Sequence, residues 1–262
     1  MLDLGFLQIK WYSFFIFLAV IIASFLIYKE AKKKQFPPGD LENIIFYGFL
    51  SGIIGARVYY VVFNLDYYLE TPIEMLKVWN GGLAIHGGLL AGLLFIGIYC
   101  HKKKINFLLL LDIVVVGLII AQAIGRWGNF FNGEAYGRTV ELSFLENLHL
   151  PKFIIKGMYI DGLYREPTFL YESFFSLLGF FLLLGLRKIQ KLRVGQLLGS
   201  YFIWYGIERF IIEGLRADSL MLGSFKIAQI ISLLFIIIGI YFLFKNIKNN
   251  RYYKEERGLL KN

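Results

Sequence analysis

The chain has 262 residues, of which 57% are apolar, 18% aromatic and only 18% charged, a balance that excludes an ordinary soluble domain and predicts an integral membrane protein. The formal net charge of +9 suits contact with anionic lipid, whereas the scatter of basic residues over several short loops argues against nucleic-acid binding. A single cysteine, Cys100, excludes an internal disulfide framework.

Seven apolar runs are long enough to cross a bilayer, which takes roughly 20 residues with a tolerance of a few. We expect these membrane helices at about 11–28, 43–63, 83–100, 107–124, 168–186, 196–213 and 226–244. No basic segment precedes the first run and three lysines, 32–34, follow it, so we expect it to be retained and not cleaved as a signal peptide. Since no internal repeat is visible, the sequence predicts one all-α polytopic membrane domain over residues 1–262.

Lysine and arginine are unevenly divided between the two sets of connecting loops. Seventeen of the 28 lie in the segments 29–40, 101–106, 187–194 and 245–262. Cytoplasmic loops carry the basic excess, so we expect these segments in the cytoplasm and the N-terminus outside. The 42-residue connection 125–166 is then extracytoplasmic, and its length predicts a small head of functional or partly structured character.

Two pairs of glycines four residues apart lie within predicted membrane helices: Gly48 with Gly52, and Gly88 with Gly92. This small-residue spacing lets two helix backbones approach closely in lipid. We expect both pairs to serve helix packing.

The stretch 125–138 gathers polar residues at the end of the fourth apolar run. It reads Gly-Arg-Trp-Gly-Asn-Phe-Phe-Asn-Gly-Glu-Ala-Tyr-Gly-Arg. Glycines let a ligand approach the backbone, guanidinium forks suit phosphate, and asparagine amides add donors and acceptors. An ordinary turn whose arginines reach lipid headgroups is the alternative. The density of polar groups at one membrane edge favours a binding site.

A polar stripe runs along the sixth apolar run. Residues at i, i+4, i+8 and i+11 share one face of a helix, and here they are Tyr205, Arg209, Glu213 and Arg216. An arginine in an apolar region is costly and normally faces a partner or a wet cavity. An ion pair between Glu213 and Arg209 with a purely structural role is the alternative.

His86 lies near the outer end of the third run, where Gly87 and Gly88 leave room beside it. A lone histidine on a helix is most often a packing residue, but this room favours a functional one. The three histidines lack metal-ligand spacing, and no phosphate-binding Walker loop, nucleophile elbow or paired-cysteine motif occurs. We therefore expect neither a metal nor a cofactor.

Three motifs, taken together and in order, resemble those of the prolipoprotein diacylglyceryl transferases. They are Trp79-x-Gly81-Gly82 with His86-Gly87-Gly88, Gly125-Arg126-x-Gly128-Asn129-Phe130-x-Asn132-x-Glu134-x-x-Gly137, and Tyr205-Gly206-x-x-Arg209-Phe210-x-x-Glu213-x-x-Arg216. Trp11-Tyr12 resembles the start of the family. Glu166 and Phe169 depart from the family pattern, which usually has His and Gln there, and Ser13 stands where Gly is common.

The resemblance implies an enzyme of the bacterial cytoplasmic membrane that transfers the diacylglyceryl group of phosphatidylglycerol to the lipobox cysteine of a prolipoprotein, releasing glycerol 1-phosphate. Its partners would be phosphatidylglycerol, the prolipoprotein signal peptide and membrane lipids. Residues expected in catalysis are Arg126, Arg209, His86 and Glu134. Residues expected to bind substrate are Tyr12, Asn129, Asn132, Gly137, Tyr205, Glu213 and Arg216.

Two questions stay open at the level of sequence. A thiol near pKa 8.5 needs help to ionise at neutral pH, and either His86 or Glu134 could supply the base. A transporter or flippase for an anionic lipid could use the same arginines without bond chemistry, although the missing repeats count against it. A purely structural membrane scaffold would not need a polar stripe within a helix.

Overall fold

The computed structural model describes residues 2–3, 8–9, 11–78, 81–217, 219–245 and 253. Trp79 and Asn80, which begin the first of the three motifs, lie outside these residues. The chain divides into two compact units, one made of Met1–Glu30 with Leu111–Glu256 and the other of Ala31–Leu110 with Arg257–Asn262.

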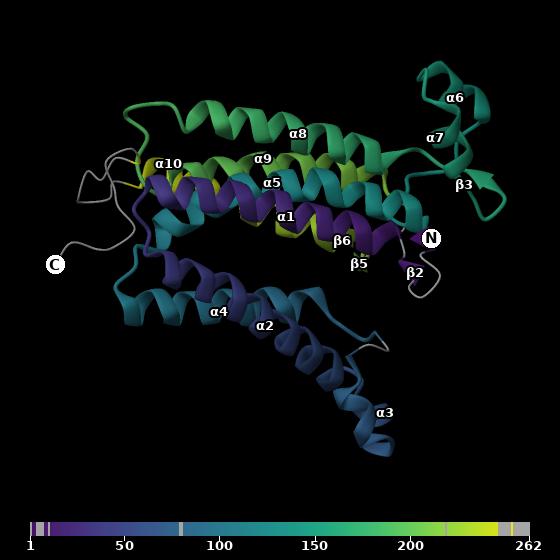
Figure 1. Ribbon diagram of the computed structural model, residues 1–262. Helices are drawn as coiled ribbons and strands as arrows, with labels where there is room; N and C mark the ends of the chain where they lie inside the picture. The colour runs from purple at the N-terminus through teal and green to yellow at the C-terminus, as the bar shows by residue number, and fades with distance from the viewer. Residues whose placement is uncertain are drawn as a thin grey trace. The chain divides into compact units, whose positions relative to one another are not determined.

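Long helices occupy all seven ranges in which apolar runs predict them (Figure 1). They are α1 (Trp11–Lys33), α2 (Pro38–Val62), α4 (Ile85–Lys103), α5 (Phe107–Asn132), α8 (Thr168–Leu186), α9 (Gln196–Leu215) and α10 (Ile227–Phe244). Within α1, α2, α5, α8 and α10 lie five stretches long and apolar enough to cross a membrane. The predicted class, a helical membrane protein, is therefore confirmed at this level.

In the unit 31–110, α2 packs against α4 through the glycines that the sequence singles out. A Cβ atom added at Gly88 would lie 3.1 Å from the carbonyl oxygen of Gly52, and one at Gly92 would lie 3.5 Å from that of Gly48. Larger side chains would separate the two backbones. The predicted packing role of both glycine pairs is confirmed.

Arg57 of α2 organises the connection between α2 and α4, which contains α3 (Leu65–Glu70) and the 3₁₀ helix η1 (Pro72–Leu76). Its guanidinium donates to the carbonyl oxygens of Met75 at 2.9 Å, Gly81 at 2.7 Å and Gly82 at 2.9 Å. The side chain is buried, so these bonds satisfy its donors inside the unit. Arg57 therefore fixes the segment that leads into α4.

In the other unit, glycines again lie where two helices come close together. A Cβ atom at Gly199 of α9 would lie 2.8 Å from the carbonyl oxygen of Gly239 in α10. At the start of α9, the buried carboxylate of Asp112 in α5 accepts hydrogen bonds from the backbone N–H groups of Gly195 at 2.6 Å and Leu198 at 2.8 Å. Asp112 thus satisfies free donors at the start of α9 and fixes its position beside α5.

Residues 142–164 form a small folded segment, which we call the head. It contains α6 (Leu142–Asn147), α7 (Lys152–Gly157) and the antiparallel pair β3 (Tyr159–Ile160) and β4 (Leu163–Tyr164). Figure 1 shows α6 and α7 beyond the ends of α5 and α8. Leu145, Ile154 and Met158 of the head bury their side chains against Phe130 and Phe169, which come from those two helices.

Short antiparallel pairs also join β1 (Leu2–Asp3) to β2 (Gln8–Ile9) and β5 (Met221–Leu222) to β6 (Phe225–Lys226).

The predicted boundary of the fourth helix at Ile124 is wrong. α5 continues to Asn132, so the first eight residues of the 125–166 segment are helical and the connection begins at Gly133. Apolar character falls at Gly125, but nothing in Arg126 to Asn132 prevents helical hydrogen bonding, and Phe130 still packs inward. Gly133, at φ +67°, is where the helix stops.

Candidate functional site

Two arginines from different helices meet at one carboxylate. Arg126 Nε lies 2.8 Å from Glu172 Oε2, and Arg209 Nη1 lies 2.7 Å from Glu172 Oε1. Arg126 comes from the last part of α5, Glu172 from the start of α8 and Arg209 from α9. The structure therefore brings together the two arginines that the sequence places in one site, through a residue that the sequence analysis did not select.

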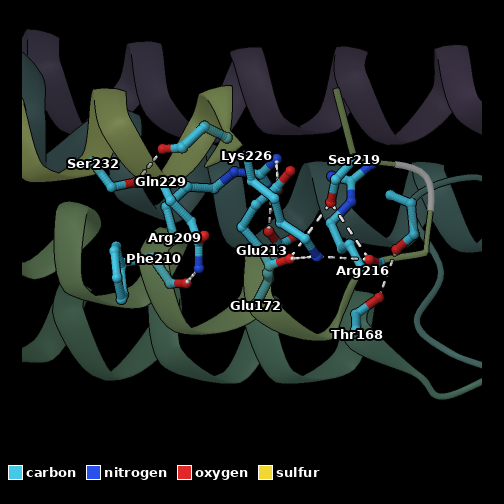
Figure 2. Close-up of polar contacts among 12 residues, drawn as sticks. Thr168, Glu172, Arg209, Phe210, Glu213, Arg216, Ser219, Lys226, Gln229 and Ser232 are labelled. Atoms are coloured by element: carbon cyan, nitrogen blue, oxygen red, sulfur yellow. Dashed lines mark hydrogen bonds and ion pairs between the residues drawn. The ribbon is translucent and has the colours of Figure 1, made fainter. Parts of the chain in front are cut away.

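Glu213 completes this cluster on α9. Its Oε2 lies 2.6 Å from Arg209 Nη2, so Arg209 contacts a carboxylate with each of its terminal nitrogens (Figure 2). The side chains of Glu172 and Glu213 are only 2% and 3% exposed, and that of Arg209 is 16% exposed. Unpaired charges in such surroundings would cost several kcal/mol each, which explains why two cations and two anions occur together.

The end of α9 is held by a second set of polar contacts, next to this cluster (Figure 2). Lys226 Nζ donates to the carbonyl oxygens of Glu213 at 2.6 Å and Arg216 at 3.0 Å. These carbonyls lie where a helix leaves its acceptors unsatisfied, and a cation is favoured there. Arg216 is the residue that follows the helix, with extended backbone angles. The predicted stripe is therefore helical at Tyr205, Arg209 and Glu213, whereas the predicted helical position of Arg216 is wrong, because the helix ends at Leu215.

Gly137 lies where the backbone of the signature meets the backbone at Glu166, before α8, and at Arg216, after α9. Its N–H donates to the carbonyl oxygen of Glu166 at 2.9 Å, and it forms an antiparallel bridge with Arg216. A Cβ atom there would lie 2.8 Å from Cβ of Glu166. Gly137 is thus placed by close backbone packing at the same end of the unit as the arginines.

The amides and carboxylate of the signature extend from the arginine cluster to the surface. Asn129 Oδ1 accepts a long hydrogen bond of 3.4 Å from Arg126 Nη1. Asn132 and Glu134 are exposed and contact each other, with Asn132 Nδ2 donating to Glu134 Oε1 at 3.1 Å. Asn129 therefore contacts the arginine cluster, whereas Asn132 and Glu134 pair with each other at the surface.

Two tyrosines predicted to bind substrate flank the same helices. Tyr12 of α1 packs against Gly128, whose added Cβ would lie 3.0 Å from the tyrosine ring. Tyr205 is half-buried one turn before Arg209 and interacts electrostatically with Arg126, Arg209 and Glu172. Both therefore lie near the signature, Tyr12 beside its backbone and Tyr205 beside its arginine.

His86 belongs to the unit 31–110, whereas the arginine cluster belongs to the other unit. It is the second residue of α4 and is exposed, with its ring centroid 6.4 Å from that of Tyr59 in α2. Within its own unit, His86 therefore lies at the start of α4, near Tyr59 of α2.

The two departures from the family pattern have defined structural roles. Phe169 is buried and stacks on Phe130 with ring centroids 4.6 Å apart, which ties α8 to α5. Glu166 is buried and its Oε2 lies 3.1 Å from Nε of Arg138. Phe169 replaces a polar residue by apolar packing, and Glu166 gains an ion pair with the last arginine of the signature.

Glu172 is the functional candidate that sequence reasoning missed. It is the only charged residue of α8, at the fifth position of the helix, which is a signal for a partner inside the membrane. Among the described residues, no group of three or more His, Cys, Asp and Glu side chains is arranged to hold a metal ion. The charges gathered at Glu172 are arginines, which favour an anionic ligand.

Comparisons with known proteins agree over nearly the whole chain. The family model described as prolipoprotein diacylglyceryl transferase matches residues 1–245. The phosphatidylglycerol–prolipoprotein diacylglyceryl transferase of Listeria welshimeri is 46% identical over 258 residues, which cover 98% of this chain and 93% of the relative. The protein of the same name from Staphylococcus haemolyticus is 47% identical over 260 residues, which cover 98% of this chain and 92% of the relative. That from Lactobacillus delbrueckii subsp. bulgaricus is 41% identical over 261 residues, which cover 98% of this chain and 94% of the relative.

Proposed function

Because the chain belongs to the prolipoprotein diacylglyceryl transferase family, we propose that it transfers the diacylglyceryl group of phosphatidylglycerol to the lipobox cysteine of a bacterial prolipoprotein. The thiolate sulfur attacks the glycerol carbon that carries the phosphate. A carbon–sulfur bond forms as the carbon–oxygen bond breaks, and the electron pair leaves with glycerol 1-phosphate. The thiol proton passes to a base.

The observation that carries this proposal is the convergence of Arg126 and Arg209 on Glu172. Two guanidinium groups that reach both oxygens of one carboxylate can also reach two oxygens of one phosphate, which has similar spacing and charge. Charge grows on the leaving phosphate as its ester bond breaks, so donors fixed at that place stabilise the transition state more than the bound lipid. Each arginine would contribute about 3 kcal/mol, or two decades in rate.

The remaining site residues take supporting roles in this mechanism. Glu213 holds Arg209 in position through their 2.6 Å ion pair. Asn129, at the arginine cluster, and Asn132 with Glu134, at the surface, would orient the headgroup, while Tyr12, Tyr205, Gly137 and Arg216 would line or shape the region. His86 is the proposed base and Glu134 its rival.

The proposed topology has all seven long helices crossing the membrane. The lysine and arginine bias then places the N-terminus and the head outside and the C-terminus in the cytoplasm. In this orientation the arginine cluster lies toward the outer leaflet, because it occupies the ends of α5 and α9 and the start of α8, next to the head. A phosphate could bind there while its acyl chains stay in lipid.

The direct test is to incubate the purified protein with phosphatidylglycerol and a lipobox peptide. We expect mass spectrometry to show a diacylglyceryl thioether on the peptide cysteine, with release of glycerol phosphate in equal amount. A peptide with serine in place of cysteine is the matched control and should stay unmodified. Transbilayer movement of labelled phosphatidylglycerol without any thioether would contradict the transferase and support a flippase.

A further inference from the structure

A second group of polar side chains lies beside the arginine cluster, on the same three helices. α5 ends and α8 starts next to the head, and α9 ends beside the segment between them, where the N–H of Arg138 donates to the carbonyl oxygen of Leu215 at 3.2 Å. Residues that precede Arg126 in α5 or follow Glu172 in α8 therefore lie farther from the head. Gln122 precedes Arg126 by one turn, Ser176 follows Glu172 by one turn, and Glu208 directly precedes Arg209. The phosphate-binding mechanism uses none of these three side chains.

The bonds within this group connect the helices. Gln122 Nε2 donates to the hydroxyl oxygen of Tyr201 at 3.0 Å, and Ser176 Oγ donates to Glu208 Oε1 at 2.7 Å. Tyr201 interacts electrostatically with both Glu208 and Arg126. Glu208 in turn interacts electrostatically with Glu172, Arg126 and Arg209. The group therefore borders the arginine cluster and is not a separate site.

Two buried acceptor atoms in this group lack a partner. Within the described part of the chain, Gln122 Oε1 and Glu208 Oε2 have no hydrogen-bond donor, although both atoms are inaccessible to solvent. Glu208 as a whole is only 7% exposed. A buried acceptor without a donor is costly, so such atoms usually mark a place that a ligand or water fills. A ligand that carries hydrogen-bond donors beside its phosphate would satisfy both atoms.

We propose that Gln122 and Glu208 bind the headgroup hydroxyls of the lipid and so select a polyol headgroup. The proposal rests on the proposed function, which makes phosphatidylglycerol the donor lipid. Its headgroup carries two hydroxyl donors, on the second and third carbons from the phosphate, which match two acceptors beside the arginines in number and kind. Glu208 Oε1 stays with Ser176, and Oε2 takes the hydroxyl. Gln122 keeps its bond to Tyr201 and offers its free oxygen.

A site that hydrogen-bonds a substrate hydroxyl rejects the analogue that lacks it, because its own acceptors are then left unpaired. The matched analogue is phosphatidylpropanol, which keeps the acyl chains, the phosphate charge and the three-carbon headgroup but lacks both hydroxyls. We expect the unmodified protein to use it with a kcat/KM at least tenfold below that for phosphatidylglycerol.

The decisive measurement is the ratio of kcat/KM for phosphatidylglycerol to kcat/KM for phosphatidylpropanol, compared between the unmodified protein and its variants. Glu208→Leu and Gln122→Leu should lower kcat/KM for phosphatidylglycerol several-fold and leave that for phosphatidylpropanol almost unchanged, so the discrimination collapses toward one. Glu208→Gln keeps an oxygen acceptor and should keep most of the discrimination. Gln229→Leu is the control, because Gln229 of α10 also donates its amide to α9, at the carbonyl oxygen of Phe210 at 3.2 Å. It should leave the ratio unchanged.

The outcomes separate the two proposals. If the unmodified protein forms no thioether from either lipid, the proposed function fails. If it uses both lipids equally, or if both leucine variants lower the two rates in parallel, the hydroxyl proposal fails while the transferase stands. Phosphatidylethanolamine is a third donor lipid to test. If the unmodified protein uses it as well as phosphatidylglycerol, and Glu208→Leu loses this activity, the acceptors bind an ammonium group and the hydroxyl assignment is wrong.

Discussion

Arg126 and Arg209 contact opposite oxygens of a single carboxylate, that of Glu172, at 2.8 and 2.7 Å. Since the two arginines belong to α5 and α9 and the carboxylate to α8, the contact fixes three helices at once. Together with Glu213 the cluster holds two positive and two negative charges. Its structural role and its proposed catalytic role can be tested separately.

Removing the charge of Glu172 leaves two buried arginines with only Glu213 to balance them. We expect Glu172→Gln to lower the free energy of unfolding by about 3–5 kcal/mol, as for other buried ion pairs that lose one partner. We also expect turnover to fall by about two decades, because Arg126 then loses its ion pair and Arg209 keeps only Glu213. Thermal unfolding in detergent and thioether formation measure the two effects.

The matched control is Glu146→Gln, which removes a carboxylate from an exposed position in the head. It should change the stability by less than about 0.5 kcal/mol. If Glu172→Gln behaves like this control in both measurements, Glu172 neither holds the arginines nor supports the reaction.

The shape of the guanidinium groups, and not only their charge, should matter. Arg126→Lys and Arg209→Lys keep the positive charge but lose the planar fork that binds two oxygens at once. We expect each variant to insert and fold, to retain lipid binding, and to lose at least about 99% of turnover, because the lost bonds strengthen toward the transition state. Lys188→Ala, at an exposed site, is the control. Near-normal turnover of both lysine variants would exclude paired hydrogen bonds to the phosphate.

Gly137 offers a test of whether a residue of the signature acts through backbone packing or through substrate binding. A methyl group there would lie 2.8 Å from Cβ of Glu166 and 3.0 Å from Cγ2 of Thr168, and both neighbours are buried. We expect Gly137→Ala to destabilise the protein by about 1–3 kcal/mol, measured by thermal unfolding. Gly185→Ala is the control, because a Cβ at Gly185 of α8 meets no atom within 4 Å. Loss of turnover at full stability would instead assign Gly137 to substrate binding.

The positions of the long helices could be predicted because each depends on a local property, a run of apolar residues. The end of α5 could not, since a helix in a membrane protein can continue into polar sequence when its side chains find partners. Arg126 and Asn129 do so through Glu172 and each other. Hydropathy falls at Gly125, but the helix ends only at Gly133, where the backbone turns to positive φ.

The helix positions and the lysine and arginine bias could place both arginines at the outer edge of the membrane, and the resemblance to family motifs then indicated one site. Spacing within one helix relates Arg209 to Glu213, and their ion pair has the expected i, i+4 separation. No such rule relates Arg126 to Arg209, because their contact depends on how α5, α8 and α9 pack. Glu172 was overlooked for the same reason: its importance comes from two partners on other helices.

The proposed orientation predicts which side of the membrane reaches two exposed positions. Cys100 is the only cysteine and is buried, so Cys100→Ser gives a background free of thiols. In that background we expect Glu146→Cys, in the head, to react with an impermeant maleimide from outside intact cells. Lys33→Cys, at the end of α1, should react only after the membrane is opened. The reverse pattern would place the arginine cluster in the inner leaflet and contradict the topology.

The identity of the base follows from comparing His86 with Glu134. Both side chains are exposed, and each could accept a proton from a substrate thiol. We expect His86→Asn to lower turnover about 10²- to 10⁴-fold at neutral pH while phosphatidylglycerol binding survives, which is the usual contribution of a general base. Raising the pH toward 9 should recover part of this loss, because the thiol then ionises without help. Glu134→Gln keeps the size of the side chain and removes its basicity, so under this assignment it should retain most of its turnover. If Glu134→Gln shows the large loss with recovery at high pH and His86→Asn does not, Glu134 is the base.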